Sequence, residues 1–227
     1  MKVKLISHSQ VQDLVGSPKE DLKNDSSLLG LVAYCARVSN PSNQNNTATN
    51  SKLVNYLVKH KHWSPLEMVS VCLEIETTRD IAHQIVRHRS FSFQEFSQRY
   101  ADPNDMGDLF VMSEARLQDT KNRQNSIEID DPELQMAWYK EQEKVTEAAD
   151  MAYSWAIKHG IAKEQARKVL PEGLTKTRLY MNGTLRSWLH YIDLRSANGT
   201  QKEHMIVAQE CAIVIARLFP MIWELKP

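Results

Sequence analysis

The chain has 227 residues, enough for a well-buried core, and we expect one domain covering residues 1–227. Lys plus Arg and Asp plus Glu both number 28, so the formal net charge is zero, which argues against a protein that grips nucleic acid through its backbone. The three cysteines are widely spaced and odd in number, as in a reducing compartment without a disulfide framework. No apolar run approaches the roughly 18 residues that span a bilayer. We expect a soluble, cytoplasmic chain with no membrane partner.

Two stretches dense in turn-forming residues, 39–51 and 101–110, are predicted to be loops. Between them, residues 69–77 alternate apolar and polar side chains, which predicts a half-buried strand with Val69 at the start of its apolar face. Residues 177–183 are a second candidate strand.

Helical periodicity predicts the remaining elements. Asp131 and Pro132 supply a cap and a first-turn proline for a long helix that stops at Gly160. Further helices are predicted at 79–89, 161–170, 184–195 and 202–219. The helix from Thr184 has an apolar stripe made by Leu185, Trp188, Leu189 and Ile192. Strands and helices mix without a regular βαβ rhythm, so the predicted class is α+β or irregular α/β.

Residues 87–100, RHRSFSFQEFSQRY, gather three arginines and three serines in fourteen residues. If residues 95–99 are extended, Glu95, Ser97 and Arg99 point to one side, where a hydroxyl beside a guanidinium suits a phosphate. Just upstream, Gln84 and Arg87 stand one helical turn apart and could read a nucleobase edge or a phosphate. For any single residue an ordinary surface explains the pattern, but the whole set favours an anion-binding pocket.

Two other stretches could carry chemistry or plain structure. In HWSPLE, residues 62–67, Ser64, Pro65 and Glu67 fit a helix capping box, so local structure alone would explain them. In TLRSWLHYIDLR, residues 184–195, Arg186 and His190 share one helix flank. Arg195 lies at the helix end, where the helix dipole favours any cation.

Several familiar sites are absent from the sequence. There is no Gly-rich phosphate loop, no HExxH zinc pattern and no recognisable cysteine nucleophile, so we expect no metal.

The segment 87–100 resembles the signature of the flavin-dependent thymidylate synthases, RHRxxSxNExSxRY, with Gln94 where Asn is usual. A second departure is Gly199, where many members carry a histidine. The likeness covers most of the chain and is weakest over 101–130. It extends to other short stretches: His62 to Glu67, Gln84, Ala166-Arg167 before Leu170-Pro171, Arg186 to Arg195, and Glu203.

The resemblance implies a central, mostly antiparallel sheet flanked by helices, in a homotetramer that binds FAD and dUMP where subunits meet. It implies that dUMP becomes dTMP, with methylenetetrahydrofolate as one-carbon donor and NADPH-reduced FAD as hydride source. Carried over by position, the implied FAD contacts are Ser64, Arg87, His88, Arg89, Glu95, Thr184, Leu185, Arg186 and His190. The implied dUMP contacts are Gln84, Arg87, Glu95, Phe96, Ser97, Gln98, Arg99, Arg167 and Arg195. Arg195 matches the catalytic residue held to polarise the uracil ring.

Two readings from other classes remain open at the level of sequence. A nucleic-acid-binding module would use the arginines on phosphates and the aromatic rings on bases, and it would be colourless. A structural or interaction protein would present the 184–195 helix face to a partner and bind neither flavin nor nucleotide.

Overall fold

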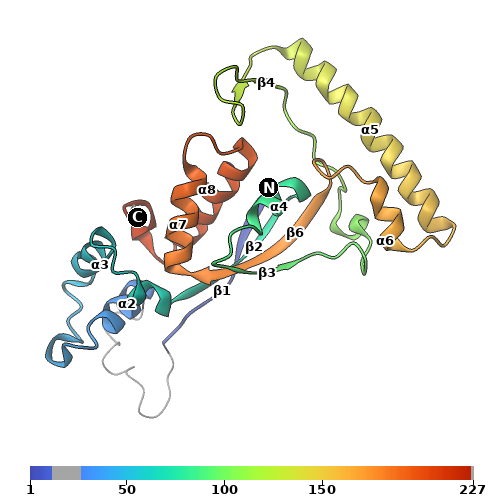
Figure 1. Cartoon of the computed structure of the whole chain (residues 1–227). Helices are drawn as coiled ribbons and strands as arrows, with labels where there is room; N and C mark the ends of the chain where they lie inside the picture. The colour runs from blue at the N-terminus through green and yellow to red at the C-terminus, as the bar shows by residue number, and fades with distance from the viewer. Residues whose placement is uncertain (12–26, 226–227) are drawn as a thin grey trace.

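The computed structural model describes residues 1–11 and 27–225. It is a mixed α/β structure built on an antiparallel sheet, as the predicted class requires (Figure 1). The strand order in this sheet is β1 (Lys2–His8), β2 (Ser70–Thr78), β6 (Lys176–Thr184) and β3 (Ser92–Glu95). Each neighbouring pair is antiparallel. A separate hairpin joins β4 (Arg116–Gln118) to β5 (Ser126–Glu128).

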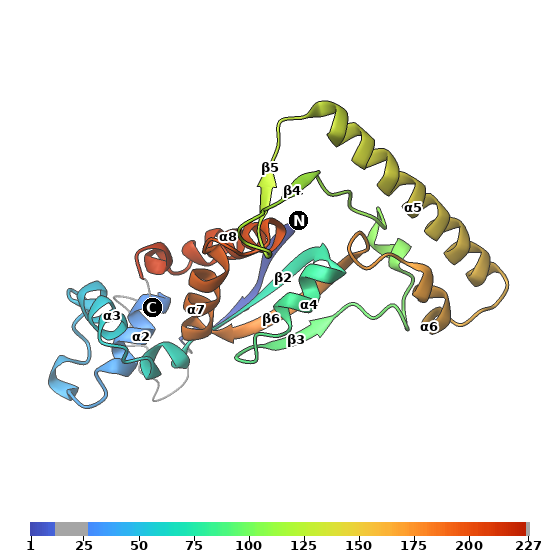
Figure 2. The same ribbon diagram turned by 45° about the horizontal axis from the view of Figure 1, so that its top comes forward.

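The helices in the described residues are α2 (Leu28–Ala36), α3 (Asn50–Lys59), α4 (Arg79–Ile85), α5 (Pro132–Lys158), α6 (Lys163–Ala166), α7 (Leu185–Ser196) and α8 (Lys202–Ala216). Short 3-10 turns lie at Pro41–Asn43, Ser64–Met68, Pro103–Met106, Arg167–Val169 and Pro220–Trp223. Helices α4, α7 and α8 pack on the sheet. Figures 1 and 2 both place α2 and α3 beyond one end of the sheet and α5 and α6 beyond the other. None of the helices in these residues is long and apolar enough to cross a membrane.

The core lies between one face of the sheet and the helices α4, α7 and α8. The predicted alternation of β2 is confirmed, since Val71, Leu73 and Ile75 are fully buried. Trp188 of α7 packs into the same core and donates its indole N–H to the Val71 carbonyl at 3.0 Å. The opposite face of the sheet is polar and carries ion pairs such as that between Arg178 and Glu76. Burial of one face only is the usual state of an antiparallel sheet.

Two long helices follow their sequence signals closely. Asp131 caps α5 by accepting from the Leu134 N–H at 3.0 Å, and the helix ends two residues before Gly160, which has φ +73°. Thr184 caps α7, and the predicted apolar stripe of this helix is buried. The last helix stops at Ala216, short of the predicted 219.

Three local predictions are wrong. Helix α4 ends at Ile85 rather than residue 89, because the chain must turn back so that Phe91 packs on Trp188 (ring centroids 4.8 Å apart). The predicted helix 161–170 consists of α6 and a 3-10 turn. Leu170 is extended at ψ 128°, the conformation that a following proline favours.

The capping box at residues 62–67 is the third error. Ser64 begins a 3-10 turn and makes no capping bond, and Glu67 pairs with Arg186 instead. The prediction that residues 95–99 are extended is also only partly correct. Strand β3 ends at Glu95, and the Tyr100 N–H closes a turn on the Ser97 carbonyl at 3.0 Å.

Candidate functional site

The structure brings together Gln84, His88 and Arg195, three of the predicted site residues, with Tyr191 and His204; we call these five residues the Arg195 cluster. The Arg195 Nε–H donates to His88 Nε2 at 2.9 Å. His204 lies 3.1 Å from Gln84 Oε1 through Nδ1 and 3.1 Å from the Tyr191 hydroxyl through Nε2. The cluster joins α4 and the turn after it to α7 and α8, which come about a hundred residues later in the sequence.

Both histidines of the Arg195 cluster are held neutral. Burial lowers the pKa of His88 to about 4, with the Arg195 charge acting in the same direction. Burial lowers the pKa of His204 to about 3, again with contributions from Arg195 and His88. Burial also raises the pKa of Tyr191 well above its usual range, so this phenol keeps its proton. Arg195 therefore carries the positive charge of the cluster.

A second group of predicted residues meets at the start of α7, around Trp63. The His190 ring lies 4.6 Å from the Trp63 ring, and the Arg186 guanidinium stands 5.9 Å from the Trp63 centroid. Glu67 accepts a hydrogen bond from Arg186. Burial, followed by the Arg186 charge, lowers the pKa of His190. The Trp63 and His190 rings are tilted by 59° to each other, and with the Arg186 guanidinium they form a surface of aromatic and cationic groups suited to an aromatic ligand.

Three other predicted residues near this surface differ in exposure. Ser64 is exposed beside Trp63. The Thr184 hydroxyl accepts from the Ser187 N–H as the cap of α7. Leu185 is fully buried, and its N–H donates to the Val69 carbonyl, so its side chain belongs to the core.

The segment 95–99 lies elsewhere on the chain. Glu95 accepts from the Thr177 hydroxyl at 2.9 Å and pairs with Arg79 at 3.4 Å. Arg99 pairs with Glu164 of α6 at 3.7 Å, next to the turn that begins with Arg167. Within the segment, Phe96 and Ser97 are half-buried, and Gln98 is buried.

Within one chain, the predicted dUMP residues are therefore divided between two places. Both views show α6, which precedes Arg167, beyond the end of the sheet opposite α7, which bears Arg195 (Figures 1 and 2). Arg87 and Arg89 lie exposed in the turn after α4. No ion pair joins either arginine to another residue in the described part of the chain.

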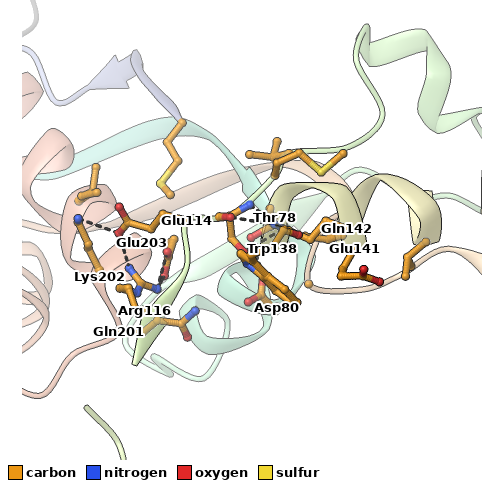
Figure 3. A pocket seen from close by; sticks show the side chains of 18 residues that line it. Thr78, Asp80, Glu114, Arg116, Trp138, Glu141, Gln142, Gln201, Lys202 and Glu203 are labelled. Carbon is orange, nitrogen blue, oxygen red and sulfur yellow. Dashed lines mark hydrogen bonds and ion pairs between the residues drawn. The ribbon is translucent and has the colours of Figure 1, made fainter. Parts of the chain in front are cut away.

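A cavity of about 860 Å³ lies between α5, the segment 111–116 and the start of α8. Figure 3 shows Trp138 and Gln142 of α5 on one side, with Arg116, Lys202 and Glu203 on the other. Arg116 holds this edge by pairing with both oxygens of Glu203, at 2.7 and 2.9 Å. None of the predicted site residues lines the cavity, although Gln201 does, and Gln201 accepts from Gln84 at 2.7 Å. Arg116 and Lys202 in its walls are paired with Glu203 and Glu114, so the cavity is a weaker candidate for a ligand site than the residue clusters.

Sequence reasoning missed His204, Tyr191, Gln201 and Trp63. The available signal for His204 was a lone histidine on the apolar face of the helix predicted at 202–219, where it is fully buried. In the described residues, no group of three or more His, Cys, Asp or Glu side chains could hold a metal ion.

Comparisons with known proteins cover nearly the whole chain. The sequence model of the family described as thymidylate synthase complementing protein matches residues 24–221. The probable flavin-dependent thymidylate synthase of Paramecium bursaria Chlorella virus 1 is 49% identical over 192 residues, covering 85% of this chain and 87% of that protein. The flavin-dependent thymidylate synthase of Synechocystis sp. is 47% identical over 194 residues, covering 85% and 86%.

The fold is also similar to that of a solved structure. The crystal structure of the UMP/dUMP methylase PolB from Streptomyces cacaoi, bound with 5-Br dUMP, superposes with a TM-score of 0.80 at 25% identity, covering 98% of this chain and 93% of that one. The chain therefore belongs to the thymidylate synthase complementing proteins, the family of the flavin-dependent thymidylate synthases.

Proposed function

We propose that this protein is a flavin-dependent thymidylate synthase that converts dUMP to dTMP, with methylenetetrahydrofolate as the one-carbon donor. The observation that carries the proposal is the match to the family over residues 24–221 together with near 50% identity to proteins of that name. FAD, reduced by NADPH, would supply the hydride that completes the methyl group.

The proposed flavin contacts are Ser64, Arg87, His88, Arg89, Glu95, Thr184, Leu185, Arg186 and His190. Their chemistry fits a flavin dinucleotide. Exposed Arg87 and Arg89 can neutralise a pyrophosphate, and the Trp63 surface with Arg186 and His190 suits a ring system. Leu185 fits less well, since its side chain is buried in the core.

The proposed dUMP contacts are Gln84, Arg87, Glu95, Phe96, Ser97, Gln98, Arg99, Arg167 and Arg195. Ser97, Arg99 and Arg167 would hold the phosphate monoester, whose two negative charges call for more than one guanidinium fork. Gln84 and Arg195 would hold the uracil edge. The Nε–H of Arg195 is occupied by His88, which leaves its terminal N–H groups to donate to a uracil carbonyl. A fixed positive charge there stabilises electron density that develops on the carbonyl during attack.

We propose further that the enzyme is a homotetramer whose sites are shared between subunits. Two features of the single chain support this. The turn after α6, which begins with Arg167, and α7, which bears Arg195, lie at opposite ends of the sheet. In addition, α5 exposes large apolar side chains, among them Trp138, Met151 and Trp155. Helix α5 packs against α6 and the turn after it, while much of its length stands apart from the sheet. A second subunit would cover this apolar surface and bring Arg167 to the Arg195 of its partner.

The test is spectroscopic. We expect the purified protein to be yellow, to bleach with NADPH without oxygen, and to form dTMP only when dUMP and methylenetetrahydrofolate are both present. Light scattering should give the mass of four chains. A colourless protein that binds nucleic acid in a salt-dependent way, or one that binds neither flavin nor dUMP, would contradict the proposal.

A further inference from the structure

Helix α8 carries a fully buried histidine, His204, whose two ring nitrogens both have partners. Its helix neighbours in the core, Val207, Ala208 and Cys211, are fully buried and apolar or nearly so. Apolar packing alone would be served by a leucine at this position. A buried imidazole costs free energy unless its nitrogens are satisfied, so its two partners account for its stability here.

The direction of each hydrogen bond follows from which groups can donate. A neutral imidazole has one N–H. Tyr191 is buried and His204 is the partner of its hydroxyl, so the phenol proton is best used by donating to His204 Nε2. The single N–H of His204 then lies on Nδ1 and donates to Gln84 Oε1. If both hydrogen bonds ran in the opposite direction, the Tyr191 O–H would be buried without an acceptor, which costs more free energy than an unused lone pair.

These two hydrogen bonds also fix the orientation of the Gln84 amide. Its oxygen faces buried His204, while its nitrogen faces Gln201, which accepts one N–H at 2.7 Å and borders both the cavity of Figure 3 and a second one of about 390 Å³. The end of the Gln84 amide that is turned away from buried His204 is therefore the donor end.

We propose that His204 is a positioning residue that holds Gln84 with the remaining N–H of its amide toward the nucleotide, so that the site selects a pyrimidine carbonyl over an amino group. This inference rests on the proposed function, because it assumes that Gln84 contacts the base of dUMP. Uracil presents a carbonyl where cytosine presents an amino group, and two donors facing each other cannot pair. His204 would thus favour dUMP over dCMP without touching either.

A pair of substitutions at this position tests the idea. His204→Leu removes the donor to Gln84 and frees its amide to rotate. His204→Asn can place an amide N–H close to where Nδ1–H lies, so it should keep Gln84 in place. The quantities to measure are the dissociation constants of dUMP and dCMP, obtained by titration of the flavin-loaded enzyme. The preference for dUMP should fall by about tenfold in His204→Leu, the worth of one hydrogen bond, and should be largely kept in His204→Asn.

A purely structural role for His204 predicts a different result. Both variants would then melt earlier or lose flavin while the ratio of the two dissociation constants stayed at the wild-type value, and that outcome would overturn the proposal. Equal loss of selectivity in both variants would overturn it as well. Gln84→Ala separates a failure of the His204 inference from a failure of the proposed enzyme function. If it leaves dUMP binding unchanged while the wild type still forms dTMP, the His204 inference fails and the proposed enzyme function stands.

Discussion

Acid should destabilise this protein in part through His204, and His204→Asn should remove that part. His204 is fully buried, and its pKa in the folded protein is about 3, against 6.5 for an exposed histidine. The groups that face it are Arg195 and His88, both of which disfavour its protonation, together with the uncharged Gln84 and Tyr191. The unfolded chain therefore takes up a proton at a pH where the folded chain does not. The stability is present above about pH 6.5 and is lost as the pH falls toward 3.

The size of the effect follows from these two pKa values. At pH 5 the unfolded state gains free energy from protonating a histidine of pKa 6.5, and the folded state gains almost nothing. The difference is about 2 kcal/mol relative to pH 7.5. Asparagine does not titrate in this range, so the loss of stability between pH 7.5 and pH 5 should be smaller by about that amount in His204→Asn. His88 acts in the same direction but is present in both proteins, so its contribution largely cancels.

Urea unfolding at fixed protein concentration, followed by fluorescence at pH 7.5 and pH 5, measures this difference. The relevant quantity is the change between the two pH values, because the substitution also alters the stability at pH 7.5. If the wild type and His204→Asn lose the same free energy on acidification, His204 is not held neutral in the folded protein and the argument is wrong.

Three further predictions follow from the site and the core. Arg195→Lys should fold and stay yellow but form dTMP about 10²–10³ times more slowly, because the planar donor is lost, while NADPH oxidation changes much less; a parallel fall of both rates would make Arg195 a structural residue. Arg99→Ala should weaken binding of dUMP far more than that of deoxyuridine by titration, and equal weakening would remove Arg99 from the phosphate site. Gly183→Ala should lower the free energy of unfolding by about 1–3 kcal/mol, because a Cβ there would overlap the Phe91 ring, whereas Gly173→Ala, which meets open space, should not.

The sequence predicted those elements whose signals are local. Alternation located β2, and the Asp131 and Thr184 caps located the starts of α5 and α7. It did not reveal β1, α2, α3 or the β4–β5 hairpin, whose lengths and patterns are weak without their packing partners. The end of α4 was wrong for the same reason. Its turn is set by Phe91 packing on Trp188, nearly a hundred residues away in sequence.

The candidate site shows the same limit. The signature at 87–100 and the helix 184–195 could be picked out as sequence patterns. The sequence could not show that, within one chain, the turn that begins with Arg167 lies at the other end of the sheet from the helix that bears Arg195. The pairing of Glu67 with Arg186 replaced a capping box that fitted the local sequence well. His204 carried no motif at all, and its importance depends on contacts with Gln84 and Tyr191, which lie on other elements.

Arg195 differs physically from the arginines that serve the fold alone. Arg116 is paired with Glu203 and Arg178 with Glu76, so a neighbouring carboxylate neutralises the charge of each arginine. Arg195 is held instead by a neutral imidazole, which fixes its orientation and leaves its charge uncompensated by any carboxylate partner in the described residues. An uncompensated charge beside buried groups costs stability, so a helix-end arginine kept only for the dipole would be better placed in solvent. Holding a guanidinium by a neutral acceptor is the arrangement expected where its charge is to be used on a substrate.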